Sequence, residues 1–336
     1  MKMGEDENWS ILAGVRFFLA FIVVNGHIGF FRPSAMGAFF DQFGGKAAVV
    51  GFLVISGYSV SASMANKRDG FLRRRFLRIY PIYGLTIIYA AFLQYVVGAQ
   101  TLTGLQLAPS SPVTLAGNLF LVQSYLVPRI DFDPPVWSLS IEFSFYILLF
   151  FMHRISKYAL VFAGVFSFLF FLLPLDLSDH RFYQLAMKAN MIRYLWPFLV
   201  GVYLFKQPLM WHFGVVAVVG SLACGFSPTT YEPLSWMTFL IVIIAVAATR
   251  RNVGRSQRWL DYLGDLSYPL YLVHFPLWIT MFAVWQVQDS LVYMIAAIIA
   301  SVILTSVVEA PVRRRLARGI SWGHSIIQAR AAPASP

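Results

Sequence analysis

Long apolar stretches separated by short polar segments run through the whole sequence, and this pattern limits the fold more than any other feature. A helix needs about 20 mostly apolar residues to cross the roughly 30 Å hydrocarbon core of a bilayer. Charged residues make up only 12% of the chain, which is about half the share in a soluble domain. We therefore expect an all-α, polytopic membrane bundle of about ten transmembrane helices. The expected spans lie near residues 11–31, 47–66, 81–97, 138–152, 158–175, 191–205, 212–226, 234–249, 266–285 and 290–308.

The distribution of Lys and Arg predicts the orientation. With ten spans and both termini in the cytoplasm, the cytoplasmic segments hold 19 of the 26 Lys and Arg residues, as the positive-inside rule requires. The stretch 113–127 is short and contains Asn118 and Gln123, so it is either a further span or a re-entrant segment. Counting it as a span would place the basic loop 250–258 outside, and ten spans are therefore the better prediction.

The ends of the chain are expected to be simple. The first residues lack the basic region of a cleavable signal peptide, so the first apolar stretch should be retained as a helix. Residues 1–312 are expected to form a single membrane-embedded domain. Residues 313–336 form a short basic tail that has little to bury, so we expect a disordered cytoplasmic segment.

Two ionisable residues share the first span. Arg16 and His27 are eleven positions apart, which places them about 20° apart on one helix face and roughly 16 Å apart along the axis. Ionisable groups inside a bilayer are costly and are functional candidates by default. The alternative is that Arg16 reaches to the inner headgroups and His27 merely bonds a neighbouring helix.

Other polar residues in or beside the spans allow two interpretations each. The basic residues of segment 67–78 precede Pro81 in an expected cytoplasmic loop, and they are either topology signals or a phosphate site. Glu142 lies inside the fourth span and suggests a buried His or Arg partner. His274 lies between two prolines, and it either contacts a ligand or bonds a carbonyl that a proline frees.

Several other features are expected to be structural. Cys224 lies in an apolar stretch and is expected to be a packing residue. Glu309 and Arg313 are expected to interact at a helix end. The histidines lack the i, i+3 or i, i+4 spacing of a helical metal site, so we expect no metal, and we expect no nucleic-acid partner.

Six short motifs occur in a fixed order along the chain. They are Arg16 and His27 with ten residues between them; FLVISGY at 52–58; Arg74, Arg75, Arg78, Ile79, Pro81 and Tyr83; Trp137, Ser138, Leu139, Glu142, Phe145 and Tyr146; Ser267, Tyr268, Tyr271, Leu272, His274 and Pro276; and Glu309 with Pro311.

This ordered set resembles the acyltransferase 3 family of integral membrane proteins. Bacterial members O-acylate the sugars of lipopolysaccharide, exopolysaccharide, capsule and nodulation factors. The chain departs from the family pattern before the Ser-Gly motif, where many members carry Val-Asp and this chain reads KAAVVGFLVISG without an acid. Many relatives also carry an extracytoplasmic hydrolase-like domain, which we do not expect in a chain of this length.

The resemblance implies an O-acyltransferase of the bacterial inner membrane, an enzyme that transfers groups other than aminoacyl groups. Its donor would be cytoplasmic acyl-CoA, usually acetyl-CoA, and its acceptor a hydroxyl of a glycan or a lipid-linked sugar. Membrane lipids and a polysaccharide biosynthesis complex are further candidate partners.

The resemblance also assigns roles to residues. Arg74, Arg75 and Arg78 would bind the phosphates of coenzyme A. His27 would be the general base or a covalent acyl carrier, with Arg16 steadying the donor or a carboxylate and Glu142 orienting His27 or the acceptor. Weaker candidates for substrate binding are Trp137, Ser138, Tyr271 and His274.

Two other classes of protein share this architecture. A transporter or flippase would move its substrate without consuming acyl-CoA. A non-catalytic subunit of a polysaccharide synthesis complex would tolerate alanine at His27.

Overall fold

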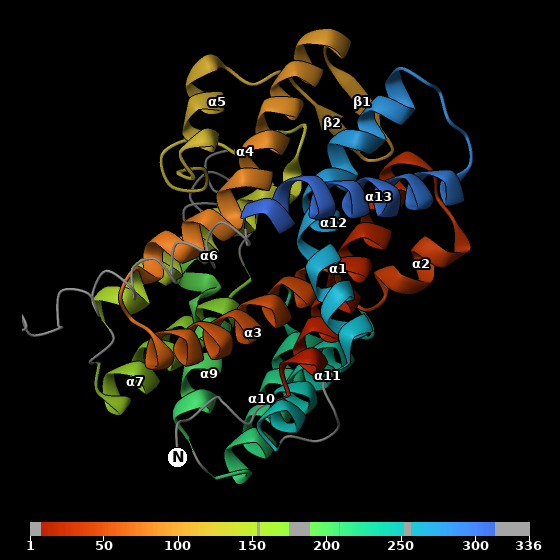
Figure 1. Cartoon of the computed structure of the whole chain (residues 1–336). Coiled ribbons are helices and arrows are strands. Elements are labelled where there is room, and N and C mark those ends of the chain that lie inside the picture. Colours follow the sequence, from red (N-terminus) through yellow and green to blue (C-terminus); the bar gives the residue numbers. More distant parts are fainter. Residues whose placement is uncertain are drawn as a thin grey trace, which may run out of the picture.

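The expected all-α architecture is confirmed in a computed structural model, which describes residues 8–152, 155–174, 189–207, 209–230, 232–251 and 257–312 (Figure 1). The helices are α1 (Trp9–Phe31), α2 (Ala35–Asp41), α3 (Gly45–Asn66), α4 (Phe71–Val97), α5 (Pro112–Leu119), α6 (Trp137–Phe151), α7 (Lys157–Leu172), α9 (Leu195–Lys206), α10 (Trp211–Phe226), α11 (Ser235–Arg250), α12 (Arg258–Ala283) and α13 (Ser290–Leu304). A 3₁₀ turn at Pro134–Val136 precedes α6, and a π-helical turn at Thr305–Glu309 follows α13.

Six helical segments of the described chain are long and apolar enough to cross a membrane. They are α1, α3, α4, α6 with the turn before it, α12, and α13 with its extension to Val312. Three shorter apolar helices, α7, α10 and α11, have 16 residues each and so extend for about 24 Å. The number of ten spans and the cytoplasmic position of the termini stay predictions. The expected tail 313–336, and with it the partner expected for Glu309, lies outside the described residues.

The expected boundary between the basic loop and the third span is wrong. Helix α4 begins at Phe71 directly after Gly70, so Arg73 to Arg78 occupy its first two turns rather than a loop, and Pro81 lies inside the helix. The stretch 113–127 contains α5, an eight-residue helix about 12 Å long, which is too short to span a bilayer. Turns follow it as far as the 3₁₀ turn before α6.

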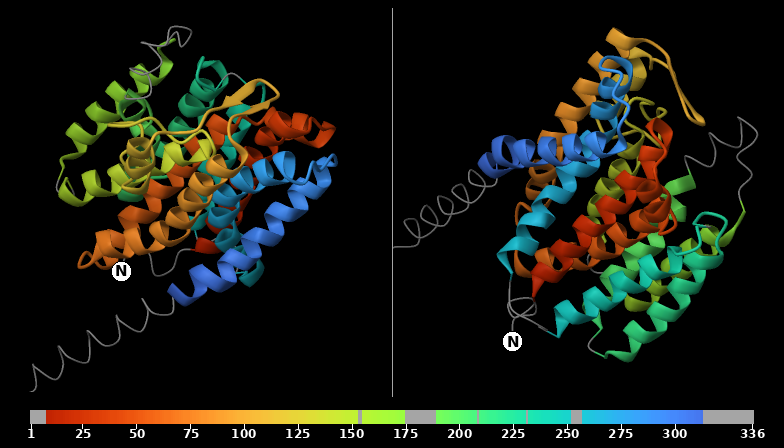
Figure 2. Two further views of the ribbon diagram at one scale, coloured as in Figure 1. Left: turned by 90° about the horizontal axis from the view of Figure 1, so that it is seen from above. Right: turned by 90° about the vertical axis from the view of Figure 1, so that its right-hand side faces the viewer.

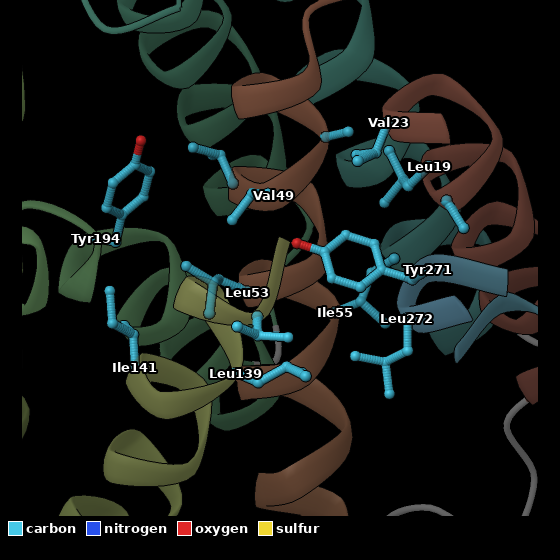
Figure 3. Close-up of a cluster of buried hydrophobic side chains, with 14 of the residues drawn as sticks. Leu19, Val23, Val49, Leu53, Ile55, Leu139, Ile141, Tyr194, Tyr271 and Leu272 are labelled. Carbon is cyan, nitrogen blue, oxygen red and sulfur yellow. The ribbon is translucent and has the colours of Figure 1, made fainter. Parts of the chain in front are cut away.

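Helix α3 runs through the middle of the molecule. Helices α4, α12 and α13 lie on one side of it, and α9, α10 and α11 lie on the other (Figures 1 and 2). Helices α1, α6, α9 and α11 all contact α3. Figure 3 shows side chains from three of the helices that meet at this place: Leu53 of α3, Leu139 of α6 and Tyr271 of α12.

Glycines allow the backbones of α3 and α9 to touch. A Cβ atom at Gly57 would lie 2.0 Å from the carbonyl oxygen of Phe198, and one at Gly201 would lie 2.1 Å from the carbonyl oxygen of Val54. Small residues permit such close helix contacts inside membranes. Gly57 belongs to the FLVISGY motif, so this motif has a packing role.

A small hairpin covers one end of α1. Strands β1 (Gln100–Leu102) and β2 (Leu105–Leu107) pair antiparallel across a turn in which Gly104 has a φ of 71°. The turn residue Thr103 donates its backbone N–H to the carbonyl of Phe30 at 3.0 Å. The hairpin is therefore fixed to the end of α1 that carries His27.

Candidate active site

Arginine side chains from α1 and α4 converge at one end of the helix bundle. Arg16 donates from Nη2 to Ser59 Oγ of α3 at 2.9 Å. The guanidinium of Arg75 lies over the ring of Tyr146, 5.8 Å from its centroid. Arg16, Arg75 and Arg78 line a cavity of about 90 Å³ between these helices and α6 and α12. The cluster is a strongly cationic site, and anions are its natural ligands.

Glu142 lies with the arginines and not with the histidines. It accepts hydrogen bonds from Ser56 Oγ at 2.7 Å and from the Tyr146 hydroxyl, and it lines the same cavity as Arg16. It also interacts electrostatically with Arg16 and Arg75. Glu142 therefore lies near Arg16 and Arg75, and no hydrogen bond joins it to His27 among the described residues.

Two larger cavities share the same arginines. One has a volume of about 460 Å³ and the other about 340 Å³, and Arg75 and Arg78 line both. Arg16 lines the smaller of these two and the 90 Å³ cavity, while Arg74 lines only the larger. The guanidinium of Arg74 donates to the carbonyls of Lys67 and Asp69, so it also fixes the turn before α4. The three cavities thus meet at Arg75 and Arg78.

The two histidines predicted from separate motifs form one pair. His27 Nδ1 of α1 lies 2.9 Å from His274 Nε2 of α12, and the rings are nearly parallel at 6°. His274 is fully buried and its Nδ1 lies 3.0 Å from the carbonyl oxygen of Leu270. A carbonyl only accepts, so Nδ1 of His274 carries a hydrogen and Nε2 accepts one from His27 Nδ1. This assignment leaves Nε2 of His27 with a free lone pair.

Tyr271 connects the cavity to the histidine pair. It lines the 90 Å³ cavity, and its ring centroid lies 6.5 Å from that of His274. Its hydroxyl lies 2.8 Å from Ser138 Oγ, and both groups donate to the carbonyl of Pro135. The structure therefore brings Ser138, Tyr271 and His274 together, as the motifs suggest. Trp137 instead contacts the ring of Tyr194 at 5.1 Å and is not among the cavity-lining residues.

Several residues near these groups were missed in the sequence. Ser59, which binds Arg16, lies one helical turn after Ser56, and this i, i+3 spacing was a usable signal. Asp265 lines both of the larger cavities. Asp133 is fully buried beside the motif that begins at Trp137, and burial raises the pKa of its carboxyl well above the ordinary value. Asp before two prolines resembles a simple turn, so nothing in the sequence marked Asp133 as buried.

Within the described part of the chain, no three His, Cys, Asp or Glu side chains gather closely enough to hold a metal ion. The arginines can bind anions, and the histidine pair can transfer a proton.

Comparison with known proteins agrees with the motifs. The model of the acyltransferase domain that defines the acyltransferase 3 family matches residues 9–310. The chain belongs to the acyltransferase 3 family. Together with the apolar helices, this membership makes it a multi-pass membrane protein.

The chain is also similar to individual proteins. The chain is similar to "Acyltransferase MdmB" of Streptomyces mycarofaciens, with 35% identity over 146 residues, which covers 40% of this chain and 37% of MdmB. It is also similar to "Putative membrane-bound transacylase BcsY" of Komagataeibacter xylinus, with 26% identity over 303 residues, which covers 78% of this chain and 71% of BcsY. No solved structure matches this member of the acyltransferase 3 family.

Proposed function

We propose that this protein is an integral membrane O-acyltransferase of the bacterial inner membrane. It moves an acyl group, acetyl in the first instance, from cytoplasmic acyl-CoA to a hydroxyl of a cell-surface glycan or its lipid-linked precursor. One observation carries the proposal: the hydrogen bond between His27 and His274 leaves a basic nitrogen at one end of α1, whose other end carries Arg16 in the cationic cluster. Membership of the acyltransferase 3 family supports the class of reaction.

The cationic cluster suits the donor. Coenzyme A carries several phosphate charges, and guanidinium groups bind phosphate oxygens in a bidentate manner. Arg75 and Arg78 line all three cavities, so a phosphate bound between them has room on several sides. Coenzyme A is cytoplasmic, which places this end of the bundle at the cytoplasmic face. That orientation agrees with the excess of Lys and Arg expected there for ten spans with both termini inside.

The histidine pair suits the acceptor. Nε2 of His27 takes the proton of the acceptor hydroxyl as its oxygen attacks the thioester carbonyl carbon. The resulting tetrahedral intermediate collapses to the ester, and the thiolate of coenzyme A leaves and receives the proton from His27. His274 keeps its hydrogen bond to Nδ1 throughout, so the ring of His27 stays oriented while its charge changes. The same Nε2 would carry the acyl group if the transfer passed through acyl-His27.

Acyl donor binding tests this proposal in the full chain held in lipid nanodiscs. We expect radiolabelled acetyl-CoA to bind the wild type, and Arg75→Ala to weaken binding by about tenfold or more, since a charge-assisted contact to phosphate is lost. Arg73→Ala is the matched control, because Arg73 is exposed in the same helical turn and lines none of these cavities. His27→Ala should still bind acetyl-CoA but should release no coenzyme A in the presence of acceptor.

The opposite results have clear meanings. Failure of a folded wild-type sample to bind acetyl-CoA would favour a transporter or a non-catalytic subunit. Equal losses for Arg73→Ala and Arg75→Ala would show that general surface charge, and not the cavity arginines, attracts the donor. A radiolabel that stays on the protein and is absent from His27→Ala would identify the covalent route.

A further inference from the structure

The segment 118–136, which runs from the last turn of α5 to the start of α6, is held by hydrogen bonds of its own amide side chains. Asn118 donates from Nδ2 to the carbonyls of Thr114 and Pro128, and its Oδ1 accepts from the backbone N–H of Ile130. Gln123 donates from Nε2 to the carbonyl of Val136 at 2.9 Å. These bonds fold the segment back on itself and define its position.

The same segment nevertheless buries polar atoms that have no hydrogen-bond partner among the described residues. They are Gln123 Oε1, Ser124 Oγ, Arg129 Nε and both carboxylate oxygens of Asp133. Folded proteins satisfy most buried polar groups, because leaving one unpaired is costly. Five such atoms in one anchored segment therefore call for an external partner.

Backbone strain occurs in this segment as well. Leu121 has a φ of 59° and Ser124 a φ of 72°, and these are two of the three described non-glycine residues with positive φ. Such conformations are unfavourable for residues with a Cβ atom and gather at ligand sites. The backbone angles and the unpaired side-chain atoms are separate observations, and both occur in the same turns.

The segment lies beside the proposed acceptor end of the site. Arg129 interacts electrostatically with His27, and Asp133 interacts in the same way with Tyr271 and with Arg129 itself. The carbonyl of Pro135 accepts from the hydroxyl of Tyr271 at 3.0 Å. Asp133 and Arg129 thus belong to a segment that contacts Tyr271, whose ring lies beside that of His274.

We propose that Arg129 and Asp133 form a subsite for a polyhydroxylated acceptor, such as a sugar ring, and bind hydroxyls next to the one that reacts. A carboxyl group accepts from neighbouring hydroxyls, and a guanidinium donates to their oxygens. A simple alcohol offers one hydroxyl and cannot satisfy both groups. Asp133 is fully buried, so binding requires a shift of the segment, and relief of the strain at Leu121 and Ser124 favours that shift. This inference rests on the proposed function, whose acceptor it describes.

Photo-crosslinking tests the subsite without requiring turnover. The full chain in nanodiscs is irradiated with a mixture of azidophenyl glycosides of common hexoses, and the labelled peptide is mapped by mass spectrometry. Azidophenol, which lacks the sugar, serves as the control probe. We expect glycoside label in 118–136, competed by the unlabelled methyl glycosides, and little label from azidophenol.

Variants of the same segment identify the side chains responsible. Asp133→Ala and Arg129→Gln should each reduce the glycoside label by about tenfold, the effect of one lost hydrogen bond to a charged group. The carboxyl of Asp133 has no hydrogen-bond partner among the described residues, so its removal breaks no internal hydrogen bond, and acetyl-CoA binding by the variant checks that it folds. Asp131→Ala is the matched control, because its carboxylate already accepts from the backbone N–H of Ala108.

Label elsewhere in the chain, equal label from azidophenol, or unchanged label in both Asp133→Ala and Arg129→Gln would overturn the subsite. Acetyl-CoA binding measured on the same samples separates this failure from that of the proposed function. Glycoside label without acetyl-CoA binding would retain a sugar site and reject the acyltransferase. Acetyl-CoA binding without glycoside label would support the acyltransferase and reject the sugar subsite.

Discussion

At the scale of single residues, His274 decides which nitrogen of His27 holds a hydrogen. Its own Nδ1 is committed to the carbonyl of Leu270, so its Nε2 must accept from His27. We therefore expect His274 to act as a positioning residue for the proposed base. The two prolines on either side of it, Pro269 and Pro276, do not break the helix, which is continuous from Arg258 to Ala283.

Replacement of His274 should slow acyl transfer without changing donor binding. We expect His274→Leu to reduce kcat by roughly 10²-fold, because His27 loses the group that fixes its tautomer. His274→Gln should recover part of that loss, since its amide oxygen can accept from Nδ1 of His27. Steady-state kinetics with acetyl-CoA provide the measurement, and the KM for acetyl-CoA should not change. A raised KM with an unchanged kcat would mean that His274 contacts the donor.

Glu142 should affect the donor rather than the base. Glu142→Gln keeps the hydrogen-bonding shape beside Ser56 and Tyr146 but removes the negative charge near Arg16 and Arg75. The cluster then attracts phosphate more strongly, and we expect the KM for acetyl-CoA to fall by roughly fivefold, or about 1 kcal/mol. The pH profile of kcat should stay in place. A displaced profile would show that Glu142 acts on His27 after all.

At the scale of helices, the contact between α3 and α9 depends on glycine. Gly57→Ala and Gly201→Ala would each force a methyl group against a backbone carbonyl of the facing helix. Overpacking of this kind costs about 1–3 kcal/mol. We expect the thermal unfolding midpoint in nanodiscs, followed by tryptophan fluorescence, to fall by several degrees for each variant.

Gly164→Ala is the control for this prediction. Gly164 lies within α7, where a Cβ atom would have no neighbour within 4 Å. Its substitution should be neutral or slightly stabilising, because alanine favours the helix by roughly 0.5–1 kcal/mol over glycine. Equal losses at Gly57, Gly201 and Gly164 would refute the special role of the α3–α9 contact.

The sequence identified individual residues of the candidate site, but it did not identify which of them contact each other. Arg16, His27 and Glu142 were singled out because ionisable groups inside apolar spans are conspicuous, and Arg75 because it belongs to the basic segment 67–78. The bond between His27 and His274 was not predicted, since the two residues are 247 positions apart and helix packing alone brings them together. The sequence left His and Arg both open as partners of Glu142, and helix packing places it near Arg16 and Arg75.

Helix boundaries show a similar division. Helices α1 and α3 begin within two residues of the expected spans. At both places the apolar stretch and the helix have nearly the same first residue. Helix α4 begins ten residues before its expected span. The apolar stretch begins only after the arginines, whereas the helix already begins at Phe71, directly after Gly70. Hydropathy locates the part of a helix that lies in lipid and does not locate its ends in water.

At the scale of the whole molecule, the orientation in the membrane is the prediction most open to direct test. Asp69 precedes α4 and Gln106 lies in the hairpin after it, and both are exposed. The 27 residues of α4 separate them by about 40 Å. In intact cells we expect Gln106→Cys to react with a membrane-impermeant maleimide and Asp69→Cys to react only after lysis.

The chain itself provides a low background for this experiment. Its single cysteine, Cys224, is fully buried, as the sequence suggested, so the wild type should label weakly. If Asp69→Cys were labelled in intact cells and Gln106→Cys were protected, the orientation would be the reverse of the one predicted. The arginine cluster would then face away from the cytoplasm, and cytoplasmic acyl-CoA could not reach it.

The meeting of three cavities at Arg75 and Arg78 has a consequence for the cell's energy supply. An enzyme that admits a long polar ligand into a membrane risks a leak of protons or sodium ions, each driven by about 2.3 kcal/mol per 100 mV of membrane potential. Fixed guanidinium charges repel these cations, as arginines do in water-conducting pores that exclude protons. The residues proposed to attract the donor would therefore also insulate the membrane electrically at the point where these three cavities meet.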